Sequence, residues 1–245
     1  MSEPKRNFPL KNFYGDIHSS YDRVNRIFTF GRDVSWRRRA ARRCLENNPE
    51  SVLDVCAGTG DFILEVASQA TERGLSPRLT AYDFSPEMLD HARRKAAEIL
   101  GKDFNGSLEF IEGDVGQMPF EDESFDAMGI TFGIRNLIYE NSRATTYLGE
   151  LHRVLKTGGY FTVLESSRPR RRLWRLFNNI YLRYILPPLG GLISGNYVAY
   201  KYLASSSRNY YTRDQMGDVL EAAGFKVVGS RSLFLGSVML VIARK

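Results

Sequence analysis

The sequence is poor in the residues that build disulfides and metal sites. Its 245 residues include only two cysteines and three histidines. Cys44 and Cys56 do not have the paired spacing of metal ligands, and no cluster of histidines, cysteines and acids has it either. We therefore predict no metal site, and two isolated cysteines are typical of reduced thiols in a cytosolic protein.

Long apolar runs are missing as well. A membrane-spanning helix needs about 18 or more consecutive apolar residues, and no window of the sequence reaches that length. The first residues, Met1 to Arg6, do not lead into the apolar core of a signal peptide. We therefore expect a cytoplasmic location.

The charge balance is moderately basic. Lysine and arginine number 34 against 28 acids, a formal net charge of +6, and six of the arginines lie between Arg32 and Arg43. Composition alone favours a solvated helix face for this segment. The alternative is attraction to an anionic surface, either lipid headgroups or nucleic acid. No internal repeat is visible, and a chain of this length can bury one substantial core, so we expect one domain.

A glycine turn follows the first predicted strand. Residues 51–55 form a short apolar and β-branched run, Gly58-Thr59-Gly60 comes next, and a helical pattern begins at Phe62. Strand, glycine turn and helix form the first unit of a doubly wound sheet, whose ligands bind where the strand ends. A dinucleotide-binding turn needs a third glycine where Ile63 stands, and a phosphate-binding P-loop needs a lysine that is absent. Asp61 at the start of the helix disfavours a phosphate and suits a neutral or cationic ligand.

Two acids end the next two predicted strands. Residues 79–83 end in Asp83, and residues 110–115 contain Gly113-Asp114. An acid at the tip of the second strand accepts hydrogen bonds from ribose hydroxyls. Taken singly, each acid could be a turn or capping residue, as Asp83 before Ser85 and Pro86 illustrates. Their joint order and spacing favour a ligand site.

The remaining pattern continues the alternation of strands and helices. We predict strands over 125–130, 160–165, 225–230 and 237–243, and helices over 17–30, 34–45, 142–155 and 213–223. The segment 156–159 contains two glycines, which we interpret as the C-cap of the preceding helix.

Residues 168–211 form an insertion that a doubly wound fold does not require. It begins with Arg168-Pro169-Arg170-Arg171-Arg172, continues with apolar and aromatic residues at helical spacing, and we expect Pro187-Pro188 to break that helix. A helix packed on the core and a cover that also touches a membrane are both consistent with this pattern.

Together these motifs resemble the S-adenosylmethionine-dependent methyltransferases of the Rossmann-like class. The resemblance implies an α/β fold, a class I methyltransferase with a seven-stranded, mostly parallel sheet, an N-terminal helical lid and a helical insertion before the last helix and strands. It implies S-adenosyl-L-methionine as cofactor. The implied cofactor-binding residues are Gly58, Thr59, Gly60, Asp83, Asp114, Val115 and Thr131. The expected divisions of the single domain are a lid (1–50), a cofactor-binding core (51–166), a substrate- and membrane-facing insertion (167–211) and a C-terminal helix with strands (212–245).

Four stretches resemble a narrower family, the quinone-ring C-methyltransferases of menaquinone and ubiquinone biosynthesis (UbiE/MenG type). They are residues 21–37, residues 53–61, Phe132-Gly133-Ile134-Arg135-Asn136, and residues 155–206 with their glycines and tyrosines. The sequence departs from the family pattern at Val24, Thr29, Thr157 and Tyr210-Tyr211. These departures leave the cofactor motifs intact and concern the acceptor.

The resemblance implies methylation of a ring carbon of a polyprenylated quinol, with Arg135, Asn136 and Tyr21 as the catalytic candidates. A guanidinium keeps its charge and can hold a developing phenolate, which is why we assign that role to Arg135. An internal ion pair of Arg135 with Asp22 or Glu165 is the alternative. Tyr21, Asp22 and His18 are candidates for the proton acceptor or for lid contacts.

The acceptor is expected to be demethylmenaquinol, with a polyprenyl-methoxy-benzoquinol as the alternative. A nucleic-acid methyltransferase is disfavoured, because the fourth strand is followed by Thr131-Phe132-Gly133-Ile134 in place of an Asn/Asp-Pro-Pro-Tyr/Phe motif. Another small-molecule methyltransferase and a non-catalytic scaffold stay open. A substrate with a lipid tail implies a peripheral contact with the anionic inner face of the cytoplasmic membrane. We expect no nucleic-acid partner. The sequence leaves the oligomeric state open, with a homodimer as one option.

Overall fold

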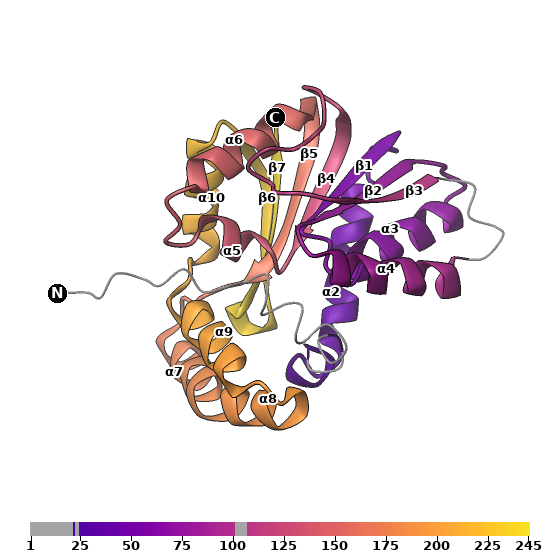
Figure 1. Ribbon diagram of the computed structural model, residues 1–245. Coiled ribbons are helices and arrows are strands. Elements are labelled where there is room, and N and C mark those ends of the chain that lie inside the picture. Colours follow the sequence, from indigo (N-terminus) through magenta and orange to yellow (C-terminus); the bar gives the residue numbers. More distant parts are fainter. Residues whose placement is uncertain (1–21, 23–24, 101–106) are drawn as a thin grey trace.

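One sheet of seven strands runs through the molecule (Figure 1). The computed structural model describes residue 22, residues 25–100 and residues 107–245, apart from the side chain of residue 199. The strands stand in the order β3-β2-β1-β4-β5-β7-β6. Their bounds are β1 (Ser51–Val55), β2 (Arg78–Asp83), β3 (Ser107–Glu112), β4 (Phe125–Thr131), β5 (Leu155–Ser166), β6 (Lys226–Leu233) and β7 (Val238–Arg244). The expected mostly parallel seven-stranded sheet is confirmed.

The strand order reverses beside β1. β1 pairs in parallel with β2 on one side and with β4 on the other, and only β7 runs antiparallel to its two neighbours. The chain therefore leaves the carboxyl ends of β1 and β4 in opposite directions. Such a switch point opens a crevice, and ligands of doubly wound sheets bind there.

Helices cover both faces of the sheet, and β7 shows why. Val238, Leu240 and Ile242 are buried in a cluster with residues of α2 (Arg32–Cys44) and α3 (Asp61–Glu72). The alternating residues Met239, Val241 and Ala243 are buried against α6 (Ala144–Val154) and α10 (Arg213–Ala222). This period of two is what a strand buried on both faces requires. α4 (Pro86–Ile99) lies on the side of α2 and α3, and α5 (Ile134–Ile138) on the other (Figure 1).

The insertion folds into helices beyond the carboxyl end of β5. They are α7 (Arg172–Ile180), the π-helical turn η1 (Tyr181–Ile185), α8 (Leu186–Ser194) and α9 (Tyr197–Asn209). A third apolar cluster joins Phe28 of the N-terminal segment to Leu182, Leu186 and Tyr200 of the insertion. Residues that are more than 150 positions apart in the sequence thus cover the same edge of the sheet.

Three local expectations were wrong. Pro187 and Pro188 do not end a helix; they lie in the first turn of α8, where a missing N–H group costs nothing. The third strand ends at Glu112, so Gly113 and Asp114 lie in the following loop.

The third error concerns the two glycines at 158 and 159, which do not cap a helix. α6 ends at Val154, and β5 begins at once with Leu155. A Cβ atom on Gly159 would lie 2.9 Å from the carbonyl oxygen of Asp126, beside an irregularity in the β4–β5 pairing. The glycine therefore permits close contact of two strands.

The expected helix over 34–45 is present as α2, whereas most of the first half of the expected helix over 17–30 lies outside the described residues. Residues 25–28 are helical. Among the helices of the described part, each is too short or too polar to cross a bilayer.

The contact between Gly129 of β4 and Phe62 of α3 predicts a sharp stability difference. A Cβ atom at residue 129 would lie 2.2 Å from the Phe62 ring, so we expect Gly129→Ala to lower the unfolding free energy by about 1–3 kcal/mol. Urea denaturation measures this change. Gly149→Ala is the matched control, because Gly149 lies inside α6 with no atom within 4 Å of an added Cβ. We expect it to gain about 0.5–1 kcal/mol, and equal effects of the two variants would contradict the packing argument.

Candidate active site

The glycine turn after β1 has a backbone that glycine adopts more readily than other residues. Gly58 and Gly60 adopt φ angles of 55° and 80°, in the left-handed region that favours glycine. A Cβ atom at Gly60 would lie 2.9 Å from the Cβ atom of Ala92, whereas one at Gly58 would meet nothing within 4 Å. The first glycine therefore faces open space, and the second permits α4 to pack against the turn.

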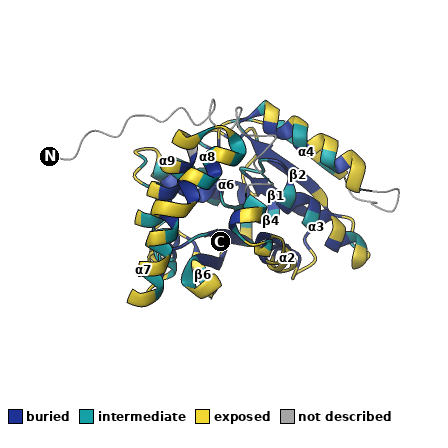
Figure 2. Cartoon of the chain, turned by 90° about the horizontal axis from the view of Figure 1, so that it is seen from below, coloured by how far each residue is buried: buried dark blue, intermediate teal, exposed yellow. Residues whose placement is uncertain are grey.

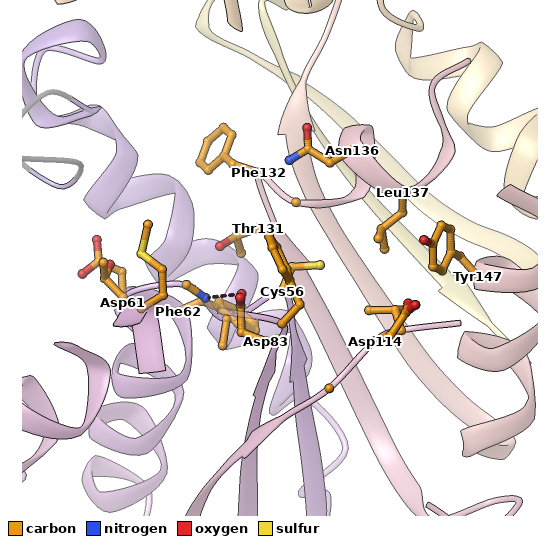
Figure 3. Close-up of a pocket in the computed structure, with 18 of the residues that line it drawn as sticks. Cys56, Asp61, Phe62, Asp83, Asp114, Thr131, Phe132, Asn136, Leu137 and Tyr147 are labelled. Atoms are coloured by element: carbon orange, nitrogen blue, oxygen red, sulfur yellow. Dashed lines mark hydrogen bonds between the residues drawn. The ribbon is translucent and has the colours of Figure 1, made fainter. Parts of the chain in front are cut away.

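Asp83 holds this turn from the neighbouring strand. Its Oδ2 accepts a hydrogen bond of 2.9 Å from the Gly58 N–H, drawn dashed in Figure 3, and its Oδ1 accepts one of 2.9 Å from Ser85. Burial raises the pKa of Asp83 above its usual value, although the backbone donors of Ser85 and Gly58 oppose the shift. Because a carboxylate offers about four lone pairs, Asp83 can still accept hydrogen bonds from the hydroxyls of a ligand.

Asp114 lies across the opening from Asp83, in the loop after β3 (Figure 3). Its Oδ1 accepts a hydrogen bond of 2.8 Å from Gly116, and its Oδ2 lies 2.8 Å from Nη1 of Arg143. Burial works against the shift, but the Gly116 N–H and the Arg143 guanidinium hold the pKa of Asp114 below its usual value. Arg143 was not anticipated from the sequence.

A cavity of about 410 Å³ lies between these groups. It brings together most of the residues that the sequence assigned to the cofactor. Its walls include Gly58, Thr59, Asp83, Asp114, Val115 and Thr131, and also Asp61, Met88, Asn136, Leu137 and Tyr147. Figure 3 labels several of these residues.

These walls fit S-adenosyl-L-methionine. The volume is within the usual range of ligand pockets, about 300–1,000 Å³. The open backbone beside Gly58 admits close approach of a ligand, and Asp61, Asp83 and Asp114 suit its cationic centre and its hydroxyls. Met88, Val115 and Leu137 supply apolar surface for a flat ring.

A second, mainly apolar cavity of about 160 Å³ adjoins the first. Phe132 and Arg37 line both cavities. Much of the remaining wall comes from the N-terminal segment, the end of β5 and the insertion; examples are Phe28, Tyr181, Leu182, Leu186 and Leu203. Residues of α2, α5 and the segment 234–238 also contribute. We call this space the acceptor cavity.

Arg135 lies in the wall of the acceptor cavity and is 5% exposed. Its Nη1 donates to the Ser206 hydroxyl and, at 3.4 Å, to the carbonyl of Leu203. Its Nε lies 3.9 Å from Oε1 of Glu165. The ion pair with Glu165, which the sequence left as an alternative, is therefore present at a residue that also faces the cavity.

Asp22 belongs to a different charge network. It accepts a hydrogen bond of 2.6 Å from the Thr59 hydroxyl, and it lies 2.9 Å from the ammonium group of Lys95 on α4. Lys95 also pairs with Asp61, whose other oxygen lies 3.5 Å from Arg37. Burial opposes the shift, but Arg37 and Lys95 hold the pKa of Asp61 below its usual value. No sequence motif singled out Lys95.

Two other candidates for acid–base or lid roles, Tyr21 and His18, lie outside the described residues. Within the described part of the chain, no group of three or more histidines, cysteines and acids could hold a metal ion.

Comparisons with known proteins agree with this geometry. Residues 2–245 match the sequence model of the ubiE/COQ5 methyltransferase family. The chain is 41% identical over 215 residues to the demethylmenaquinone methyltransferase of Thermus thermophilus, which covers 87% of this chain and 91% of that one. It is 35% identical over 236 residues, or 96% of each chain, to the ubiquinone/menaquinone biosynthesis C-methyltransferase UbiE of Geotalea daltonii.

Solved structures show the same fold at lower identity. An S-adenosylmethionine-dependent methyltransferase from Aquifex aeolicus superimposes with a TM-score of 0.55 at 20% identity and covers 83% of this chain and 88% of its own. A Thermotoga maritima protein, described as a possible histamine N-methyltransferase, gives 0.61 at 19% identity over 96% of this chain and 99% of its own. The chain belongs to the ubiE/COQ5 methyltransferase family and is an S-adenosyl-L-methionine-dependent methyltransferase.

Proposed function

We propose that the protein methylates a ring carbon of a polyprenylated quinol, with demethylmenaquinol as the preferred acceptor. The observation that carries the proposal is the apolar cavity beside the cofactor cavity, with one aromatic residue, Phe132, in the wall of both. The N-terminal segment and the insertion, which lie outside the cofactor-binding core, line the acceptor cavity together with core residues such as Arg135 and Glu165. An acceptor with an apolar ring and a lipid tail suits such walls.

The choice of the naphthoquinol rests on the relatives. Proteins from Thermus thermophilus and Deinococcus radiodurans, 41% and 37% identical to this chain, are named demethylmenaquinone methyltransferases. The Geotalea daltonii relative, whose name covers both quinones, supports a polyprenyl-methoxy-benzoquinol in ubiquinone biosynthesis as the second candidate.

Bound S-adenosyl-L-methionine supplies an electrophilic methyl group. The residues of this chain position the reactants and set the electrostatic potential around them. Asp83 and the Gly58 turn bind the cofactor, and the Thr59 hydroxyl donates a hydrogen bond to Asp22 of the lid. Aligning two bound reactants removes up to about 7–11 kcal/mol from a barrier. We assign Arg135, Asn136 and Tyr21 to the catalytic group, of which Tyr21 lies outside the described residues. The guanidinium of Arg135 stabilises negative charge on the quinol oxygen.

We further propose that residues 1–50 and 167–211 form a lid and cover over the core of residues 51–166, which leaves residues 212–245 to complete the fold. The apolar cluster of Phe28 with Leu182, Leu186 and Tyr200 supports this division, because it joins the two covering segments to each other.

The insertion also has the features of a membrane-contact surface. None of the residues of α7, all of them described, is buried, and Figure 2 shows the helix mostly in the exposed colour. Its exposed apolar side chains continue into η1 and α8; they are Leu173, Leu176, Phe177, Ile180, Tyr184, Ile185 and Leu192. An exposed apolar face of this size beside cations is typical of an interfacial helix.

Four arginines surround a hollow at the beginning of this surface. Arg168, Arg170, Arg171 and Arg213 line it together with Trp174, and among the described residues Asp214 is the acid that pairs with two of them. The surplus of positive charge complements phosphate groups of an anionic lipid. We therefore propose a peripheral location on the inner face of the cytoplasmic membrane, where a polyprenyl tail could enter the acceptor cavity.

The cofactor assignment predicts a loss of affinity in Asp83→Asn. The variant removes the charge that accepts hydrogen bonds from Gly58 and Ser85, so we expect S-adenosylhomocysteine to bind roughly tenfold to a hundredfold more weakly by calorimetry. Asp90→Asn is the control, since Asp90 is exposed on α4 and pairs only with Arg93 among the described contacts. Unchanged affinity in Asp83→Asn would remove Asp83 from the site.

The reaction assignment predicts methyl transfer to a reduced naphthoquinol with a short prenyl tail. We expect mass spectrometry to detect one added methyl group and a lower kcat/KM with the matching benzoquinol. Arg135→Gln should lower kcat by about a hundredfold, as the loss of a stabilising donor does elsewhere, with the affinity for S-adenosylhomocysteine kept. No turnover of either quinol by the wild-type protein would refute the proposal.

The membrane assignment predicts binding to vesicles that contain phosphatidylglycerol. Each cation near an anionic surface contributes about 1 kcal/mol, so Arg171→Glu with Arg172→Glu should weaken vesicle binding by about 30-fold or more. Arg94→Glu with Lys226→Glu makes the same change of charge at exposed positions outside the insertion and should bind nearly as the wild type. Equal losses of vesicle affinity in both double variants would mean that net charge alone explains the binding.

A further inference from the structure

We propose that Glu165 accepts the hydroxyl proton of the quinol as the ring carbon takes up the methyl group. This inference rests on the proposed function, since it needs a quinol in the acceptor cavity. It identifies a catalytic residue that none of the sequence motifs assigned.

Glu165 lies at the carboxyl end of β5 in the wall of the acceptor cavity, and it is 1% exposed. The other carboxylate in that wall, among the described residues, is Asp33. Asp33 accepts hydrogen bonds of 2.6 Å from Arg37, 2.8 Å from Thr29 and 3.3 Å from Arg26. The carboxylate of Asp33 therefore already accepts hydrogen bonds from two arginines and a hydroxyl. Glu165 is left as the acid in this wall that can accept a proton from a bound substrate.

The carboxylate of Glu165 has unused acceptor capacity. Its Oε1 accepts hydrogen bonds of 2.7 and 2.8 Å from the N–H and the hydroxyl of Ser166. Its Oε2 accepts one long bond of 3.3 Å from the Arg135 N–H. An ionised carboxylate offers about four lone pairs, so Oε2 can accept a further, stronger hydrogen bond from a substrate hydroxyl.

Arg135 supplies a donor next to this acceptor. Its Nε is buried, lies 3.9 Å from Oε1 of Glu165, and makes no hydrogen bond within the described residues. Buried donors are nearly always paired, because an unpaired one is costly. A phenolic hydroxyl fits both needs, since its oxygen can accept from Nε of Arg135 while its proton points to Glu165.

The neighbouring groups do not compete for that proton. Burial raises the pKa of both Tyr210 and the Cys56 thiol, and the charge of Glu165 adds to each shift, so both groups are neutral near pH 7. Burial raises the pKa of Tyr181, which also lines the cavity, to about 12. Arg37 of α2 faces its partner Asp33. Glu165 and Arg135 are thus the pair that faces the quinol oxygen.

The step balances as follows. The quinol O–H bond breaks, its proton passes to Glu165, and its electron pair moves into the ring. The adjacent ring carbon forms a bond to the methyl group, and the methyl–sulfur bond breaks with its electron pair left on sulfur. That carbon then loses its hydrogen as a proton, the ring becomes aromatic again, and the oxygen recovers a proton from Glu165. One proton is released per methyl group transferred.

The test compares pH–rate profiles for the short-tailed naphthoquinol. At pH 7 we expect Glu165→Gln to lower kcat by about 10²–10⁴-fold, the usual range for a general base. The deficit should shrink as the pH approaches about 10, the usual pKa of a phenol, because the quinol then arrives already ionised. Glu109→Gln, at an exposed position of β3, is the control and should follow the wild type.

Two measurements that do not depend on turnover accompany the profiles. S-adenosylhomocysteine should bind Glu165→Gln within about twofold of the wild type, and 1-naphthol, followed by its fluorescence, should bind about tenfold more weakly, since a charged acceptor is lost. Glu165→Asp keeps a charge facing Arg135, so it covers the case in which the glutamine variant does not fold. Its carboxylate is set back by one methylene, so we expect a smaller deficit that shrinks in the same way as the pH rises.

A wild-type rate at pH 7 in Glu165→Gln, or a deficit that stays constant with pH in either variant, would overturn the assignment. Failure of the wild-type protein to methylate any quinol would instead overturn the proposed function. In that event naphthol binding still decides whether Glu165 takes a phenolic hydroxyl: equal affinity in the wild type and Glu165→Gln refutes it.

Discussion

The parallel pairing of β1 with β4 determines where the functional residues can lie. Four residues of β1, from Val52 to Val55, pair with β4, while β2 pairs with the other edge of β1. The chain consequently leaves the two strand ends in opposite directions, into α3 after β1 and into α5 after β4. Both cavities lie at these ends, and the first turns after the two strands contribute Thr59 to the larger cavity and Phe132 to both. The sheet thus fixes the position of the opening.

A partly buried charge network joins those covering segments to the opening. Lys95 of α4 lies between Asp22 of the N-terminal segment and Asp61 of the glycine turn, and Arg37 of α2 lies between Asp61 and Asp33. Taking such charges out of water costs free energy that their attraction only partly recovers. The network instead fixes the relative positions of the segments that it joins. Acids and cations alternate, so the N-terminal segment has one favourable position relative to the cofactor turn, and the Thr59–Asp22 hydrogen bond links that position to the cofactor cavity.

The sequence predicted those features that depend on local pattern. The strand over 51–55, the glycine turn and the acid at Asp83 are contiguous motifs, and the structure has each of them at the expected place. Contacts between residues far apart in the sequence could not be predicted, because no contiguous motif marks them. Lys95 lies 73 positions from Asp22, and Arg143 lies 29 from Asp114. The misplaced prolines and glycines have the same cause. Proline both ends a helix and begins one, and glycine both caps a helix and permits close strand packing, so only tertiary context decides between the roles.

Two residues at the strand ends store backbone strain with a functional consequence. Cys56 and Phe132 have φ angles of 57° and 58°, a conformation that costs a non-glycine residue roughly 1–2 kcal/mol. Hydrogen bonds from Ala57 to Tyr82 and from Phe132 to Leu164 hold the two loops, and a Cβ atom at Gly133 would lie 2.6 Å from that of Cys56. The loops therefore interlock and cannot relax separately. A glycine at 132 would remove the strain, but the ring that packs on Trp36 and under Arg37 would be lost. That ring is in the wall of both cavities, so the strained loop keeps an aromatic partition between them.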